Sequence, residues 1–405
     1  MKNSQQEPLW TKNFIIVSSI NFLIILMFYL LIVTIAEYAV TQFGASTSTA
    51  GLVASIFIIG ILVGRLMSGR IMLSIGNKKT LFMGLSFLAV MTLCYFIAGT
   101  LPLLMVIRLL HGVAVGIVST ATGTVIAQTI PSSRRGEGIG YFSMSIVLAS
   151  AIGPFIGMLL TQSFASYNVI FIFNTVLVAI CIATAFLVKI DNSTQKTPSN
   201  PETKPGFSIK NYLEPKSLPI SFIALLIGFS YSGVMSFLSF YSKEINLVEA
   251  GSLFFLVYAI AILLSRPFTG PLMDRRGANI VIYPALTLFA LGMLLFSQAS
   301  TSFIFLFAAC IIGLGYGNFT SIAQTLAIKG IETQRLGLAT TTYFVLYDLG
   351  LGVGPFLLGF FVPTFGYRNV FLGMIPIIII SIVLYTLLVG RNEKVNTTKR
   401  KDKAL

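Results

Sequence analysis

Two carboxylates inside apolar runs of this sequence have positions that suit proton handling. Asp348 lies near the middle of an apolar run at residues 338–361, and Glu37 ends another at residues 14–37. Because apolar surroundings disfavour a charged carboxylate, such a group can take up and release a proton near neutral pH. Asp348 is therefore the first candidate for a coupling proton. The alternatives are an Asp348 that brackets the adjacent glycine-rich segment through fixed hydrogen bonds, and a Glu37 that sits at the membrane interface and gates nothing.

A cation and the only histidine of the chain share one further apolar run, residues 101–125, where Arg108 and His111 lie one turn apart. An arginine at membrane depth keeps its charge and needs an acceptor or water. Arg108 is either a functional electrostatic element or a fixed hydrogen-bonding post. His111 has an intrinsic pKa that suits a proton relay, but a lone histidine also serves in packing. One histidine without clustered cysteines predicts no metal site, and no cofactor is expected.

The composition excludes a soluble globule as the scaffold for these residues. The chain has 405 residues, 56% of them hydrophobic and 10% charged, with a mean hydropathy of +0.90. We predict an all-α membrane protein, since roughly 20 helical residues cross a hydrocarbon core. Twelve transmembrane helices are expected near residues 14–37, 50–71, 79–98, 101–125, 138–161, 167–189, 218–241, 249–272, 279–298, 302–326, 338–361 and 368–390.

The runs divide into two six-helix bundles with polar segments around them. We expect a cytoplasmic N-terminus (1–13), a first bundle (14–190), a polar linker (191–217), a second bundle (218–390) and a basic tail (391–405). Most Lys and Arg residues fall on one side of the predicted spans, which places both termini in the cytoplasm of a multi-pass cell-membrane protein. The basic surplus then indicates topology and contact with membrane lipids, not nucleic acid. A monomer is expected.

The two bundles are copies of each other at an offset of 201 residues. The segment from Arg65 to Gly76 matches the segment from Arg266 to Gly277. The same offset relates Gly112 and Gly116 to Gly313 and Gly317, and Gly153-Pro154-Phe155 to Gly354-Pro355-Phe356. Such internal repeats in a membrane protein are typical of secondary transporters, so we predict two pseudo-symmetric bundles.

These motifs resemble those of the major facilitator superfamily (MFS). The family's hairpin motif after spans two and eight, and its G-P-x-x-G motif in export-type branches, match the following residues: Gly270, Asp274, Arg275 and Gly277; Gly69, Gly76, Lys78 and Lys79; Gly153, Pro154 and Gly157; Gly354, Pro355 and Gly359. The N-terminal hairpin departs from the pattern, with Leu73 and Ser74 at the acidic and basic positions. The resemblance implies the MFS fold, hairpins that stabilise conformations, and glycine-rich helices that pack closely and favour export. We also expect Asp274 to bond the start of span five near residues 136–140.

A central cavity between the bundles is expected, with an aromatic and mildly polar lining that suits an amphipathic organic solute. The candidate lining residues are Asn21, Tyr29, Tyr231, Tyr316, Asn318, Tyr343 and Tyr347.

The sequence predicts a secondary transporter that works by alternating access and exports a small organic compound in exchange for protons. Two alternatives stay open: an importer or facilitator of a sugar or metabolite, and a lipid-handling or signalling membrane protein. No enzyme is expected, because neither a nucleophile–base pair nor a metal constellation is recognisable.

Overall fold

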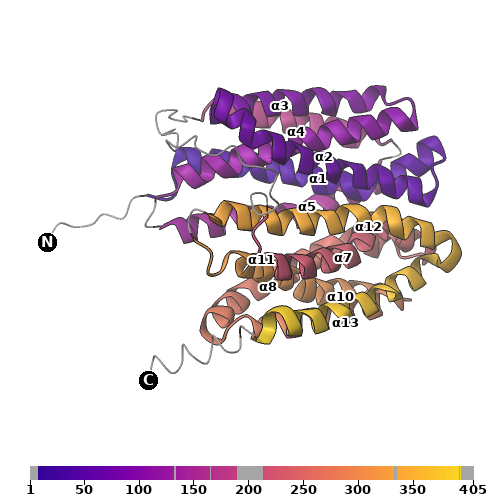
Figure 1. Ribbon diagram of the computed structural model, residues 1–405. Helices are drawn as coiled ribbons and strands as arrows, with labels where there is room; N and C mark the ends of the chain where they lie inside the picture. Colours follow the sequence, from indigo (N-terminus) through magenta and orange to yellow (C-terminus); the bar gives the residue numbers. More distant parts are fainter. Residues whose placement is uncertain are drawn as a thin grey trace, which may run out of the picture. The chain divides into compact units, whose positions relative to one another are not determined.

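The computed structural model describes residues 8–131, 134–164, 166–188, 213–332, 335–391 and 393, and within these ranges the regular secondary structure is helical. The chain folds into two compact units, Met1–Ala45 with Ile56–Asn200, and Ser46–Ser55 with Pro201–Leu405. Each unit is a helical bundle, and its helices can be followed by colour in Figure 1. Asp274 belongs to the end of a helix, but its side chain lies outside the described structure. The same holds for the side chains of residues 136–137 and 139–140, and for most of the linker and tail.

Helices of the first half begin and end as follows: α1 Lys12–Phe43, α2 Thr47–Ile75, α3 Asn77–Cys94 with a 3-10 turn at Tyr95–Ile97, α4 Leu101–Thr129, α5 Arg135–Ser163 and α6 Asn168–Ala185. Those of the second half are α7 Leu218–Glu244, α8 Val248–Arg276, α9 Asn279–Ser297, α10 Ser302–Ile312, a π-helical segment Gly313–Gly317, α11 Asn318–Ile328, α12 Leu336–Leu372, α13 Met374–Tyr385 and a second π-helical segment Thr386–Gly390.

Eleven described helices are long and apolar enough to cross a membrane, and a shorter apolar helix spans Met374–Gly390. The long helix α12 contains a break at Gly366, which has φ 73° and ψ 163°. This residue is the turn between the eleventh and twelfth predicted spans, and helical backbone resumes directly after it. The predicted all-α membrane fold is confirmed.

Equivalent residues of the two halves begin and end equivalent helices. Thr100 and Thr301 are the N-caps of α4 and α10, and each side chain accepts a hydrogen bond from the backbone N–H three residues later. Gly76 and Gly277 follow α2 and α8 with φ 86° and 87°, a conformation that favours glycine. The duplicated sequence therefore specifies duplicated helix ends.

The first helix is longer than the sequence predicted. It continues past residue 37 to Phe43 and ends at Gly44, whose φ is 62°. Glu37 therefore lies within the helix, and its residue is only 5% exposed. Glu37 at the membrane interface and Glu37 as a proton-handling group both stay predictions.

Helices α2 and α4 pack backbone against backbone through two pairs of glycines. A Cβ atom at Gly60 would lie 2.1 Å from the carbonyl oxygen of Leu109, and one at Gly64 would lie 2.2 Å from that of Val113. From the other side, a Cβ at Gly112 would lie 2.0 Å from the carbonyl oxygen of Phe57. Two G-x-x-x-G faces therefore meet, which is how membrane helices approach closely.

The two G-P segments also pack closely, each within its own unit. Next to Pro154, a Cβ at Gly153 would lie 2.7 Å from the carbonyl oxygen of Leu26 on α1. Next to Pro355, a Cβ at Gly354 would lie only 1.9 Å from the hydroxyl oxygen of Ser232 on α7. At both positions the absence of a side chain lets the neighbouring helix approach closely. A Cβ at Gly157 would lie 2.9 Å from the carbonyl oxygen of Leu30, and one at Gly359 would lie 2.6 Å from the Cα of Ser48, which belongs to the second unit.

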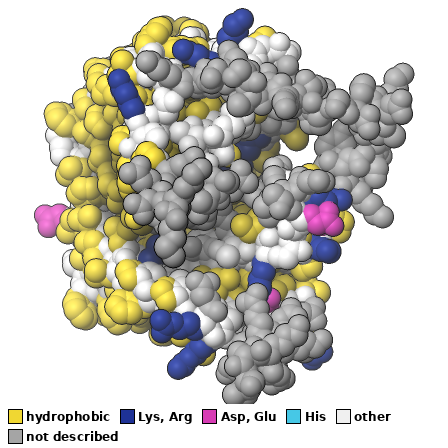
Figure 2. Space-filling view, turned by 90° about the vertical axis from the view of Figure 1, so that its left-hand side faces the viewer, with side chains coloured by type: hydrophobic (Ala, Val, Ile, Leu, Met, Phe, Trp, Pro, Cys, Tyr) yellow, Lys and Arg dark blue, Asp and Glu magenta, His cyan; other side chains and the backbone are white. Residues whose placement is uncertain are grey.

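The first glycine of each hairpin motif makes no close helix contact among the described residues. Gly69 and Gly270 are helical, and no atom of the described structure outside their own helix turn lies within 4 Å of where a Cβ would be. In these hairpins Gly76 and Gly277 are the residues with a structural need for glycine, which is their positive φ. Figure 2 shows Lys and Arg side chains in blue, scattered among hydrophobic and other side chains of the face in view.

Candidate functional site

Arg108 is completely buried in the first bundle, at 0% exposure. Its Nη1 donates to the hydroxyl of Tyr95, 3.4 Å away, and its guanidinium carbon lies 4.3 Å from the ring centroid of Phe57. Helix α4 supplies Arg108, α2 supplies Phe57, and the turn after α3 supplies Tyr95. A charge in this setting is stabilised by the ring face and by hydrogen bonding. The sequence did not single out Tyr95 or Phe57, because neither belongs to a recognisable motif.

His111 belongs to the same cluster. Its Nδ1 lies 2.9 Å from the Tyr95 hydroxyl, and its ring meets Phe57 edge-on with centroids 5.1 Å apart. Its Nε2 is buried and has no hydrogen-bond partner among the described residues. Within the same residues no group of three His, Cys, Asp or Glu side chains has the geometry to hold a metal ion.

Glu37 lies at the same level of the first bundle as Arg108. A hydrogen bond of 3.1 Å joins Asn21 on α1 to Thr122 on α4. From this bond, Glu37 lies about 24 Å along α1, and Arg108 lies about 21 Å in the same direction along the antiparallel α4, at a rise of about 1.5 Å per residue. Tyr167, between α5 and α6, is close to this carboxylate. Burial raises the pKa of the Tyr167 hydroxyl, and the charge of Glu37 raises it further.

Asn21, a predicted cavity residue, is buried against α4. The Thr122 hydroxyl lies 3.1 Å from its Oδ1, while its Nδ2 has no hydrogen-bond partner in the part of the chain that the structure describes. A buried unpaired amide donor costs free energy, so Nδ2 is suited to donate to an acceptor that another conformation or a solute supplies.

Four of the predicted cavity tyrosines form one layer in the second unit, together with Tyr258. Tyr231 stacks on Tyr316 with centroids 3.8 Å apart and on Tyr258 at 5.7 Å. The hydroxyls of Tyr316 and Tyr347 share a hydrogen bond, and Tyr347 stacks on Tyr343 at 5.9 Å. The π-helical segment Gly313–Gly317 carries Tyr316 into this layer, a local widening of the helix that is common at functional sites. Tyr29, the remaining predicted tyrosine, lies on α1 beside Phe28 at 4.7 Å.

Asp348 is on α12, directly after Tyr347, and is half-buried. Tyr343 lies five residues earlier on the same helix. The structure therefore puts the candidate coupling carboxylate beside the tyrosine layer of its own unit.

Asn318 joins α8 to the helix that follows the π-helical segment. Its Nδ2 donates to the hydroxyl of Ser265 at 2.9 Å and to the carbonyl oxygen of Leu314 at 2.8 Å, and its Oδ1 accepts from Thr269 at 2.9 Å. Both ends of the amide are used inside the unit. Ser265 and Thr269 were not predicted.

We therefore expect Asn318→Ala to destabilise the protein by about 1–3 kcal/mol, because it leaves buried polar partners unsatisfied. Thermal unfolding of the purified protein in detergent measures this. Asn369→Ala is the matched control, since Asn369 is exposed and donates only to the carbonyl oxygen of Phe365, four residues earlier, among the hydrogen bonds of the described residues. Loss of substrate binding at unchanged stability would instead make Asn318 a substrate contact.

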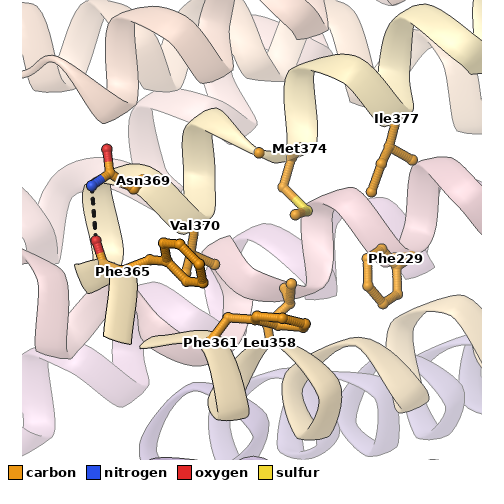
Figure 3. Close-up of a pocket in the computed structure, with 9 residues that line it drawn as sticks. Phe229, Leu358, Phe361, Phe365, Asn369, Val370, Met374 and Ile377 are labelled. Carbon is orange, nitrogen blue, oxygen red and sulfur yellow. Dashed lines mark hydrogen bonds between the residues drawn. The ribbon is translucent and has the colours of Figure 1, made fainter. Parts of the chain in front are cut away.

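A cavity of about 380 Å³ lies in the second unit between α7, α12 and α13, where Phe229, Phe361, Val370 and Met374 approach it (Figure 3). Among the described residues that line it, Asn369 is the only polar side chain, and none of the predicted cavity residues belongs to this lining. This apolar lining suits a hydrocarbon group of a ligand or lipid. The cavity and the tyrosine layer share no lining residue.

Comparison with known proteins decides the family. The model of the Major Facilitator Superfamily matches residues 17–350 and 220–404. The chain belongs to the Major Facilitator Superfamily. An uncharacterised MFS-type transporter of Methanocaldococcus jannaschii is 27% identical over 356 residues, which cover 86% of this chain and 91% of that protein. The multidrug resistance protein MdtG of Proteus mirabilis is 28% identical, covering 73% and 74% of the two chains.

The fold of this MFS chain also matches solved structures. A crystal structure of the nucleoside transporter NupG superposes with a TM-score of 0.71 at 15% identity, covering 94% of this chain and 99% of that one. At this identity the likeness concerns the fold alone. The MFS membership confirms the resemblance that the hairpin and G-P motifs indicated.

Proposed function

We propose that this MFS transporter exports a small amphipathic organic compound by alternating access, in exchange for protons taken up from outside the cell. The multidrug resistance relative supports export of an organic compound. Aromatic stacking of Tyr231, Tyr258 and Tyr316 supports a solute with apolar or aromatic surface. Both termini are proposed to be cytoplasmic, from the distribution of Lys and Arg.

One observation supports a role in transport for two charged residues of the first half. Glu37 and Arg108 are buried in the first half, whereas the equivalent residues of the second half, Leu238 and Ala309, are apolar and also buried at 0% exposure. The repeat therefore packs at these positions without charges. Because a buried charge is costly at membrane depth, we infer that the first half keeps these two charged residues for transport.

Ethidium transport into everted membrane vesicles tests this function. Vesicles from cells that express the chain, with an acidic lumen imposed, are expected to accumulate ethidium, and dissipating the pH gradient should release it. Membranes without the protein are the control. Ethidium that equilibrates equally fast with and without the gradient would favour a facilitator. Movement of labelled lipid but not of ethidium, sugars or nucleosides in liposomes would favour a lipid-handling protein and overturn the proposal.

A further inference from the structure

Three polar side chains meet at one point of the first bundle where the second bundle is apolar. Tyr95, Arg108 and His111 are 2%, 0% and 1% exposed. Their equivalents at the offset of 201 residues are Phe296, Ala309 and Ile312, all 0% exposed. The repeat thus folds with apolar residues at all three positions, so packing alone does not require the polar ones.

The hydrogen bonds between these three residues have a direction. A guanidinium only donates hydrogen bonds, so Arg108 Nη1 donates to the Tyr95 hydroxyl oxygen at 3.4 Å. The Tyr95 hydroxyl keeps its own proton, and its hydrogen-bond acceptor is Nδ1 of His111 at 2.9 Å. Donation to Nδ1 satisfies this buried proton, and it requires Nδ1 to be the unprotonated nitrogen.

A neutral imidazole whose Nδ1 is unprotonated carries its proton on the remaining nitrogen, Nε2. Nε2 has no hydrogen-bond partner among the described residues, and the imidazole ring meets Phe57 at an interplanar angle of 84°. Phe57 also lies under the Arg108 guanidinium, and Phe171 stacks on Tyr95 with centroids 5.0 Å apart. Aromatic rings therefore hold the three polar groups in place from both sides.

We propose that Tyr95 is a positioning residue for the charge of Arg108, and that His111 is a fixed, neutral acceptor with its proton on Nε2 that orients the Tyr95 hydroxyl. In this arrangement His111 acts through Tyr95 and does not carry the coupling proton. The effect on transport rests on the proposed function of Arg108, whereas the arrangement of protons does not.

Nitrogen NMR of the full-length protein in lipid nanodiscs tests the arrangement without a substrate. With ¹⁵N-labelled histidine, His111 supplies the only imidazole signals of the chain. We expect one protonated nitrogen, Nε2, and one unprotonated, hydrogen-bonded Nδ1. Tyr95→Phe keeps the ring stacked on Phe171, so it should shift the Nδ1 resonance without unfolding the protein. A proton on Nδ1, a doubly protonated ring, or an unchanged Nδ1 signal in the variant would overturn the proposal.

Tyr241→Phe is the matched control. Its hydroxyl is also buried and donates to the carbonyl oxygens of Phe296 and Ser297, both in the second unit. Removing it tests the general effect of losing a buried tyrosine hydroxyl, and it should leave the His111 signals unchanged. Signals that move as far as in Tyr95→Phe would show a global disturbance and would count against the specific contact.

Ethidium uptake into everted vesicles separates positioning from a structural role. We expect Tyr95→Phe to lower the uptake rate about tenfold, as for one lost hydrogen bond to a charged group, and to have no further effect in an Arg108→Gln background. Equal losses in both backgrounds would refute positioning of Arg108. If the unaltered protein moves no ethidium, the proposed function fails, and the NMR result still decides the arrangement of Tyr95 and His111.

Discussion

Asp348→Asn is expected to abolish gradient-driven accumulation of substrate while substrate binding stays measurable. Asparagine has the shape of a protonated aspartate but cannot release a proton, so the step that couples access to protonation is lost. Asp348 is half-buried beside Tyr343 and Tyr347, in the unit that also holds the tyrosine layer. We expect accumulation of ethidium in everted vesicles to fall at least about tenfold, with fluorescence-detected ethidium binding to purified protein within about twofold of the original.

Two further variants make this result specific. Glu244→Gln alters an exposed carboxylate at the end of α7 and should leave accumulation unchanged. Glu37→Gln alters the buried carboxylate of the first bundle. If Asp348→Asn still drives ethidium uphill with unaltered pH dependence and Glu37→Gln does not, Glu37 is the coupling group and Asp348 is structural.

Gly112→Ala is expected to cause a large loss of stability for the addition of a single methyl group. The added Cβ would lie 2.0 Å from the carbonyl oxygen of Phe57 and 3.1 Å from the Cα of Gly60. Backbone atoms cannot move aside as a flexible side chain can, so α2 and α4 must separate. We expect a destabilisation of about 1–3 kcal/mol or more, measured as a lower midpoint of thermal unfolding in detergent.

Gly123→Ala on the same helix is the control, because no atom of the described structure beyond its own helix turn lies within 4 Å of the added Cβ. Alanine favours the helix over glycine by roughly 0.5–1 kcal/mol, so this variant should be neutral or slightly stabilised. Equal unfolding midpoints for the two variants would show that α2 and α4 are not in tight backbone contact.

The sequence was sufficient for features that depend on neighbouring residues. Long apolar runs predict spans because a helix in lipid must satisfy its own backbone groups, and the two caps Thr100 and Thr301 are likewise local. The eleventh and twelfth spans were separated correctly, because Gly366 turns the chain between them even though helix continues on both sides. The extent of α1 was underestimated, because residues 38–43 form helix that composition alone does not distinguish from a loop.

The candidate site depended more on tertiary contacts. The sequence identified Arg108 and His111 as polar residues in an apolar run, but not the Tyr95 hydroxyl between them. It identified Asn318 as a candidate cavity residue. In the structure, the amide oxygen and nitrogen of Asn318 are both hydrogen-bonded, to Ser265, Leu314 and Thr269. Which side chain a polar group meets depends on how its helix is rotated against another one, and no local pattern records that rotation.

By itself the sequence determined the membrane class, the helical fold, the duplication at 201 residues and the family, since hydropathy, spacing and motifs are properties of one chain read in order. Only the tertiary structure decided which glycines are needed for contact. Gly112 and Gly123 are both glycines of α4, yet one touches the backbone of α2 and the other has room for a side chain. It likewise decided that Glu37 is buried and that Tyr95 holds Arg108. The physical reason is that close packing is set by the rotation and crossing of helices, which are fixed jointly by residues far apart in the chain.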